Sequence, residues 1–161
     1  QMCIRDSNYI SATLVLCGNG PLREWILAQK QKIQKRIKMA EIVVMPPQSA
    51  FRFLNTMNKS SVFVLPSHTE FFGLVLLEAM SLKKPVVSTY SGGPSEIITD
   101  EVDGLLISPG NIRELAAALL KLLNDSKMRT RLGLNAFQTV QNKYDVSKVA
   151  PQFIKFMETL H

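Results

Sequence analysis

Short aliphatic runs alternate with longer stretches of helical periodicity along the chain from residue 12 onward. Five of these runs lack polar alternation, as is typical of parallel strands whose sheet is covered by helices on both faces. Strands that alternate with crossover helices define the α/β class, so we expect a parallel sheet flanked by helices. The expected strands are residues 13–17, 42–45, 62–65, 86–88 and 105–107.

Helical patterns fill the intervals between these strands and the remainder of the chain. Pro21 is expected at the first position of the first helix, where its fixed φ angle is suited and its missing N–H is not needed. Asn111 and Glu114 have the spacing of a capping box, which predicts another helix start. Further helices are expected at residues 49–57, 73–82 and 94–98. The apolar stripes comprise Leu22, Trp25, Ile26, Ile33 and Ile37; Ile112, Leu115, Leu119, Leu122 and Leu123; Leu132, Phe137, Val140 and Tyr144; and Val149, Phe153, Phe156, Met157 and Leu160.

The length of 161 residues and the hydrophobic content of 46% suit one compact core. Residues 1–8 fit no strand or helix period and resemble translated sequencing-adapter read-through, so we expect a non-native or disordered leader. No apolar run approaches the roughly 20 residues that span a bilayer, and no secretory signal pattern is present. We therefore expect a cytoplasmic protein.

The formal net charge of +6 favours anionic partners. The basic run on the first expected helix, Lys30, Lys32, Lys35, Arg36 and Lys38, fits either a solvated helix face or a patch for phosphate or anionic lipid. We favour the solvated face, and peripheral contact with the cytoplasmic face of a membrane stays open. No aromatic-interleaved basic stretch is present, so we expect no nucleic-acid partner.

The cysteines and histidines lack the spacing of a metal site. Cys17 ends an expected buried strand and Cys3 lies in the leader, so both are expected to be free thiols. His68 and His161 are isolated, and we expect no metal and no cofactor.

The segment 65–87, LPSHTEFFGLVLLEAMSLKKPVV, holds the candidate chemistry. Parallel sheets bind ligands beyond the carboxyl ends of their strands, so residues 66–72 occupy a ligand position. The helix that opens at Gly73 presents free amides and a positive dipole end to an anion such as a diphosphate. Gly73 also lacks the Cβ that would keep a phosphate or sugar away from the backbone.

Two carboxylates lie eight positions apart in this segment. Glu78 falls about one and a half turns into the helix and could reach a ribose over its first turn, while Glu70 would face the sugar. The same positions also suit a surface acid and a solvated helix residue, and spacing alone leaves both interpretations open.

The pair Glu70-x7-Glu78, with Phe72 and Gly73 inside it, resembles the E-x7-E signature of family 4 glycosyltransferases. Similarity covers residues 14–144. The matching elements in order are 18–21 (GNGP), 64–67 (VLPS), 85–87 (PVV), 92–98 (GGPSEII) and 103–106 (DGLL) followed by Pro109. The resemblance implies the C-terminal half of a GT-B fold with a helical C-terminal tail. In that assignment residues 9–145 form a Rossmann-like nucleotide-sugar-binding domain lacking its first strand–loop–helix unit.

The resemblance further implies retaining transfer of a sugar from a nucleoside diphosphate, without a metal at the site. Glu70 would contact the donor sugar and stabilise developing positive charge, and Glu78 would hold the ribose. Backbone amides would meet sugar hydroxyls and phosphate, and they would stabilise the departing diphosphate. Those amides belong to Phe72, Gly73, Leu74 and Val75.

Four glycines are further candidates for donor contact. Gly18 and Gly20 form the family's G-x-G-P turn, and Gly92 and Gly93 fit equally a ligand contact and a tight turn before Pro94. His68 lies beside Glu70, but a lone loop histidine is more often incidental, so we leave it out of the site. Pro46 and Pro47 replace the family's usual glycine-containing turn in the base-binding region.

The resemblance also implies that a basic diphosphate clamp and an acceptor domain are missing, so this chain alone is expected to be inactive or nearly so. An acceptor glycan or lipid would bind through the missing domain, against which residues 146–161 would pack. Alternatives are a non-catalytic nucleotide-sugar-binding module and another GT-B enzyme, either a sucrose-phosphate-synthase-like transferase or a nucleotide-sugar epimerase. The epimerase would not need the E-x7-E pair.

Overall fold

The computed structural model describes residues 12–37 and 40–159. The expected leader, Cys3, Lys38 and Leu160 lie outside the described residues. The chain divides after Asn55 into two compact units, which we call the N-terminal unit (described from residue 12 to 55) and the C-terminal unit (described from 56 to 159). The assignment of residues 9–145 to a single domain stays a prediction.

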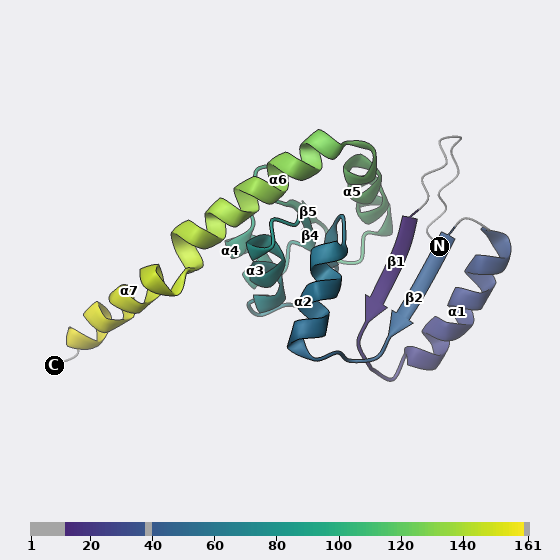
Figure 1. Cartoon of the computed structure of the whole chain (residues 1–161), viewed down its shortest axis with the longest axis horizontal. Helices are drawn as coiled ribbons and strands as arrows, with labels where there is room; N and C mark the ends of the chain where they lie inside the picture. The colour runs from purple at the N-terminus through teal and green to yellow at the C-terminus, as the bar shows by residue number, and fades with distance from the viewer. Residues whose placement is uncertain (1–11, 38–39, 160–161) are drawn as a thin grey trace. The chain divides into compact units, whose positions relative to one another are not determined.

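The N-terminal unit is built on two parallel strands, β1 (Ala12–Cys17) and β2 (Ala40–Met45), with Leu14 opposite Ile42. The crossover helix α1 (Arg23–Arg36) contacts β2, as Figure 1 shows in purple and blue. After β2 the chain enters α2 (Ala50–Lys59), which runs across the boundary between the units. Both expected strands of this unit are confirmed.

Three details of the N-terminal unit differ from the sequence expectation. Helix α1 begins at Arg23 rather than Pro21, because Arg23 N–H donates to Gly20 O at 3.1 Å and places Pro21 in a turn. No residue of α1 is buried, and Cys17, expected inside a buried strand, is exposed. The physical reason is that few elements cover one another within this unit. Helix α1 packs against a sheet of only two strands, so apolar side chains remain in contact with water.

The C-terminal unit contains a parallel sheet in the order β3–β4–β5. Its central strand β4 is buried at every position, which explains why its sequence shows no polar alternation. Helices α3, α4, α5 and α6 all contact β4, so the sheet is flanked by helices and the expected α/β fold is confirmed. The strands are β3 (Phe63–Leu65), β4 (Val86–Thr89) and β5 (Leu105–Ile107), and the helices are α3 (Leu74–Ser81), α4 (Gly93–Ile97), α5 (Ile112–Asn124) and α6 (Ser126–Thr139).

The core of this unit forms where α5 and α6 meet the sheet. Leu122 of α5 and Leu132 of α6 are completely buried against β4 and β5. The residues of this cluster are Val87, Leu105, Ile107, Ala118, Leu122, Met128 and Leu132.

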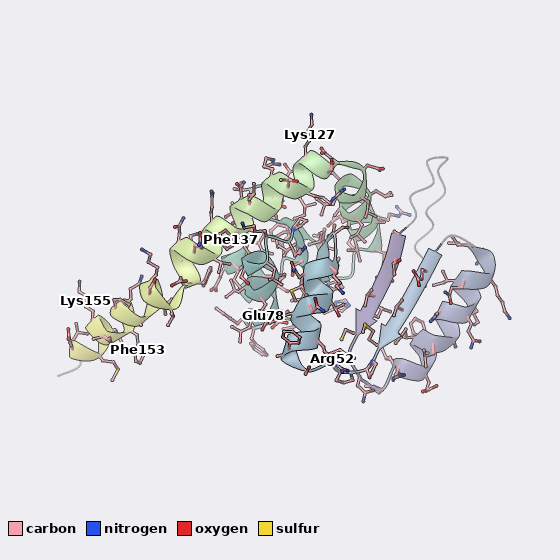
Figure 2. All side chains as sticks on the ribbon, in the orientation of Figure 1. Arg52, Glu78, Lys127, Phe137, Phe153 and Lys155 are labelled. Carbon is pink, nitrogen blue, oxygen red and sulfur yellow. The ribbon has the colours of Figure 1, made fainter. Side chains whose placement is uncertain are left out.

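The helical C-terminal tail is present, with one irregular turn. Helix α6 continues into the π-helical segment η1 (Val140–Tyr144), and Asp145 then caps α7 (Val146–Glu158) by accepting from Ser147 N–H at 2.8 Å. Helix α7 contacts η1 and has no buried residue (Figures 1 and 2). Among the described residues, no helix is both long and apolar enough to cross a bilayer.

The capping box at the start of α5 is confirmed in a modified form. Asn111 Oδ1 accepts from the backbone N–H groups of Arg113 and Glu114 at 3.2 Å. Glu114 does not accept from Asn111 N–H, which donates to Ser108 O instead. Its carboxylate accepts from Ser108 N–H at 2.6 Å and from Asn111 Nδ2 at 2.7 Å, so it joins the β5–α5 loop to the helix.

Truncation of a buried leucine should destabilise the protein far more than truncation of an exposed one on the same helix. We expect Leu132→Ala to lower the free energy of unfolding by about 2–5 kcal/mol, since Leu132 is 0% exposed. Leu134→Ala, at a side chain that is 46% exposed on α6, should change it by about 1 kcal/mol or less. Chemical denaturation of the variants measures both, and similar losses would contradict the placement of the core.

The Glu114 carboxylate should make folding sensitive to acid. Hydrogen bonds from the Ser108 backbone, and then from Asn111, lower the pKa of Glu114 from its ordinary value of 4.5. A lowered pKa in the folded state stabilises the protein above the unfolded pKa, and that contribution is lost as pH falls through the folded pKa. Glu114→Gln should therefore weaken the acid dependence of unfolding below about pH 4.5. Thermal unfolding across that range tests this prediction.

Candidate functional site

Two loops leave neighbouring strands at the carboxyl edge of the C-terminal sheet. The first, residues 66–73, leads from β3 into α3 and carries Glu70. The second, residues 90–92, leads from β4 into α4. Because β3 and β4 are parallel and paired, with Leu65 opposite Ser88, both loops start at the same edge, which is where open α/β sheets bind ligands.

Helix α3 begins without a side-chain cap. Gly73 stands at the N-cap with φ +87°, a left-handed conformation that disfavours any residue with a Cβ. Gly73 provides no side-chain cap, and Leu76 N–H already donates to Gly73 O at 2.8 Å, so the uncapped amides at this end are those of Leu74 and Val75. Leu74 is exposed and Val75 is half-buried, whereas Gly73 is buried, and a Cβ built on it would lie 3.1 Å from Leu76 Cδ1.

The structure brings Glu70 to this helix start. A Cβ built on Gly73 would lie 3.5 Å from the Glu70 Cγ, so the Glu70 side chain lies beside Gly73. Glu70 is half-buried, whereas Glu78 is exposed on α3, four residues after its first residue (Figure 2). Both acids thus belong to the loop–helix segment that the sequence singles out, and their roles stay predictions.

The two phenylalanines after Glu70 differ in environment: Phe72 packs against another ring, and Phe71 is exposed to solvent. Phe72 packs edge-on against Tyr144 of η1, with ring centroids 6.4 Å apart and an interplanar angle of 75°. Burial, and next the charges of Glu96 and Asp103, raise the pKa of Tyr144. Phe71 is 93% exposed. The loop is therefore anchored at Phe72 and presents Phe71 to solvent.

Gly92 and Gly93 are in direct contact with the backbone of the Glu70 loop. Gly93 N–H donates to Glu70 O at 3.1 Å. A Cβ on Gly92, which has φ +52°, would lie 2.5 Å from Glu70 O, and one on Gly93 would lie 2.5 Å from the Phe72 carbonyl carbon. This close packing accounts for both glycines as parts of a turn, and direct contact with a ligand stays a prediction.

Sequence reasoning missed a group of buried hydroxyls at the end of β4. Thr89 Oγ1 donates to Ser67 O at 2.5 Å and lies 2.9 Å from Ser91 Oγ. Ser88 Oγ donates to Leu65 O at 2.9 Å. The available signal was the set of hydroxyl residues Ser88, Thr89 and Ser91 directly after the aliphatic part of the strand. Buried hydroxyls require hydrogen-bond partners.

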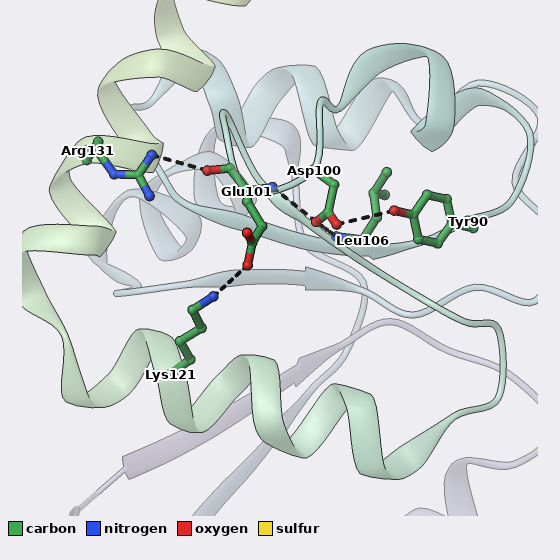
Figure 3. A network of polar contacts seen from close by, with 6 residues as sticks. All are labelled: Tyr90, Asp100, Glu101, Leu106, Lys121 and Arg131. Atoms are coloured by element: carbon green, nitrogen blue, oxygen red, sulfur yellow. Dashed lines mark hydrogen bonds and ion pairs between the residues drawn. The ribbon is translucent and has the colours of Figure 1, made fainter.

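Tyr90, which follows β4, and Asp100 hydrogen-bond to each other and to β5 (Figure 3). Tyr90 N–H donates to Ile107 O at 2.8 Å, and its hydroxyl donates to Asp100 Oδ2 at 3.2 Å. Asp100 Oδ1 accepts from Leu106 N–H at 2.8 Å, which ties the turn after α4 to β5. Desolvation, followed by the charge of Asp100, raises the pKa of Tyr90.

The next turn holds an ion pair at the surface. Lys121 Nζ lies 2.7 Å from Glu101 Oε1, and the hydrogen bond from Lys121 lowers the pKa of Glu101. Arg131 Nη1 donates to the Glu101 carbonyl oxygen at 3.1 Å (Figure 3). These contacts hold the exposed turn against α5 and α6.

The remaining candidates are His68, Gly18 and Gly20. The His68 ring packs against Gly110 in the β5–α5 loop, since a Cβ there would lie 3.0 Å from His68 Cε1. Gly18 and Gly20 lie in the β1–α1 turn of the N-terminal unit, where Gly18 N–H donates to Met45 O at 3.2 Å. In residues 12–37 and 40–159, no three His, Cys, Asp or Glu side chains gather as a metal site.

A parallel sheet flanked by helices, with loops leaving its carboxyl edge toward the helices, defines an open-sheet α/β protein. The family model for glycosyl transferases group 1 matches residues 4–139. The chain belongs to this glycosyltransferase family.

Individual relatives agree with the family assignment. An uncharacterized glycosyltransferase of Methanocaldococcus jannaschii is 33% identical over 120 residues, covering 74% of this chain and 33% of that protein. A sucrose-phosphate synthase structure from Thermosynechococcus elongatus has a TM-score of 0.76 at 28% identity, covering 91% of this chain and 38% of that one. HepE of Anabaena in complex with UDP-glucose has a TM-score of 0.75 at 23% identity, covering 91% and 41%, and shows likeness in fold. This chain spans less than half the length of each.

A side chain at position 93 should disrupt the contact between the two loops. We expect Gly93→Ala to lower the free energy of unfolding by about 1–3 kcal/mol, because the methyl group would collide with the Phe72 backbone. Ser95→Ala, at an exposed position on α4, should change it by about 0.5 kcal/mol or less. Chemical denaturation measures both variants. Equal free energies of unfolding would show that the turn accommodates a Cβ at position 93 without cost.

Proposed function

We propose that this chain is the donor-binding part of a retaining glycosyltransferase of family 4, which takes a nucleoside diphosphate sugar as donor. The observation that carries the proposal is the uncapped start of α3 at Gly73, with the Glu70 side chain beside it. Free amides at a helix start bind phosphate, and a neighbouring carboxylate accepts hydrogen bonds from sugar hydroxyls. The UDP-glucose complex of the Anabaena protein with the same fold supports this class of donor.

In this proposal the donor lies across the loop–helix segment. The diphosphate binds the amides of residues 72–75, the ribose meets Glu78, and the transferred sugar meets Glu70. Developing negative charge on the departing diphosphate is stabilised by the helix start, and Glu70 stabilises developing positive charge on the sugar. Transfer without a metal ion stays a prediction, which insensitivity to a chelator would support.

Other parts of the proposal concern the whole enzyme. The acceptor is a glycan, a lipid or a polysaccharide precursor. Helix α7 packs against the acceptor domain through its exposed apolar side chains, among them Phe153 and Phe156. A cytoplasmic location, with or without peripheral membrane contact, stays a prediction.

Transfer of the sucrose-phosphate-synthase type is a second candidate. The similarity at 28% identity to the Thermosynechococcus elongatus enzyme favours it, and in this proposal its donor would bind the same loop–helix segment. Formation of sucrose phosphate by the full-length parent would select this candidate, whereas transfer to a glycan or lipid acceptor would select the first.

The two acids should affect different parts of the donor. Titrations with UDP and with UDP-glucose, followed by NMR shifts of this chain, measure each affinity even when binding is weak. Glu78→Gln should weaken both ligands by about tenfold, since both contain the ribose. Glu70→Gln should weaken UDP-glucose by a similar factor and leave UDP unchanged.

Glu158→Gln on α7 serves as the matched control and should bind both ligands as the wild type does. Wild-type affinities in Glu70→Gln and Glu78→Gln would contradict the proposed donor site. In the full-length parent, Glu70→Gln should also slow transfer, and unchanged turnover would favour a non-catalytic role for this acid.

A further inference from the structure

The backbone of residues 66–73 belongs to no helix or strand, although Glu70 lies within it. A loop of this kind is held by its contacts rather than by a hydrogen-bonded ladder. Any role for Glu70 in binding a sugar therefore requires neighbouring groups that fix its main chain. Two such contacts come from β4 and the turn that follows it.

The first contact joins Thr89 to Ser67. Thr89 is 1% exposed, so water does not compete for its hydroxyl group. A threonine hydroxyl has one hydrogen to donate, and Thr89 Oγ1 donates it to Ser67 O at 2.5 Å. Ser91 Oγ, 2.9 Å away, must then act as donor to Thr89. The chain of hydrogen bonds thus runs in one direction, from Ser91 through Thr89 to Ser67.

The second contact joins Gly93 to Glu70, three residues further along the same loop. Gly93 N–H donates to Glu70 O at 3.1 Å, and Gly92 and Gly93 lie so close to the loop that neither position has room for a Cβ. The loop is thereby fixed at Ser67 and at Glu70. The first attachment comes from the last residue of the buried central strand β4, and the second from the first residue of α4, which follows it.

We propose that Thr89 is a positioning residue for Glu70, acting through the Ser67 carbonyl to hold the loop where its carboxylate meets the donor sugar. The proposal rests on the proposed function, since it assigns Glu70 to the sugar. Thr89 itself does not touch the donor. Its removal should reduce the advantage of UDP-glucose over UDP and leave the binding of UDP alone unaffected.

The chain offers a matched control in Ser88. Its hydroxyl is also buried and also donates to a main-chain carbonyl across the β3–β4 pair, at 2.9 Å. The acceptor is Leu65, which ends β3 and lies five residues before Glu70. Loss of the Ser88 bond should therefore lower stability without changing how the protein discriminates between the two ligands.

The experiment compares the ratio of the UDP dissociation constant to that of UDP-glucose in variants of this chain, by NMR titration. Thr89→Val removes the hydroxyl at nearly constant volume and should lower the ratio about threefold or more, toward that of Glu70→Gln. Thr89→Ser restores the hydroxyl and should restore the ratio. Ser88→Ala should keep the wild-type ratio while melting at a lower temperature.

A wild-type ratio in folded Thr89→Val, or an equal fall in Ser88→Ala, would overturn the positioning role. Should Thr89→Val fail to fold, Ser91→Ala tests the same chain of bonds by removing the donor to Thr89, and it must lower the ratio by about twofold. An unchanged ratio in Ser91→Ala would then overturn the proposal. A wild-type ratio in Glu70→Gln would contradict the proposed function itself, whereas a lowered ratio there with a normal one in Thr89→Val contradicts the positioning role alone.

Discussion

The candidate site depends on one steric constraint, the contact of two main-chain segments with no side chain between them. The turn after β4 lies against the loop after β3 because positions 92 and 93 are glycines. That proximity makes the Gly93–Glu70 hydrogen bond possible, and the pairing of β3 with β4 brings Thr89 within reach of Ser67. The loop that carries Glu70 is thus fixed by the rigid centre of the sheet rather than by its own sequence.

Much of the fold follows from the sequence, because burial leaves a pattern. All five expected strands form, since a run without polar alternation is what a covered strand requires. The N-terminal unit departs from expectation where coverage is incomplete: Cys17 is exposed and α1 buries no residue. Composition alone does not reveal how many neighbours an element will have. The π-helical turn at η1 also leaves no signal in the apolar spacing.

The candidate site was less predictable from the sequence than the fold. The spacing of Glu70 and Glu78, with a glycine between them, predicted the loop and the helix that follows it. The buried hydroxyls of Ser88 and Thr89 were not found, because serine and threonine inside a strand resemble ordinary strand residues until their partners are known. Polar residues in an aliphatic run indicate buried hydroxyls, but the carbonyl that each one bonds depends on tertiary packing and is not given by the local sequence.

Helix α7 has a consequence for how the isolated polypeptide behaves in solution. Its aromatic and aliphatic side chains, including Phe153, Ile154 and Phe156, are in contact with water. Exposed apolar side chains promote self-association as concentration rises. The last helix therefore adds to the tendency of this polypeptide to cluster with copies of itself.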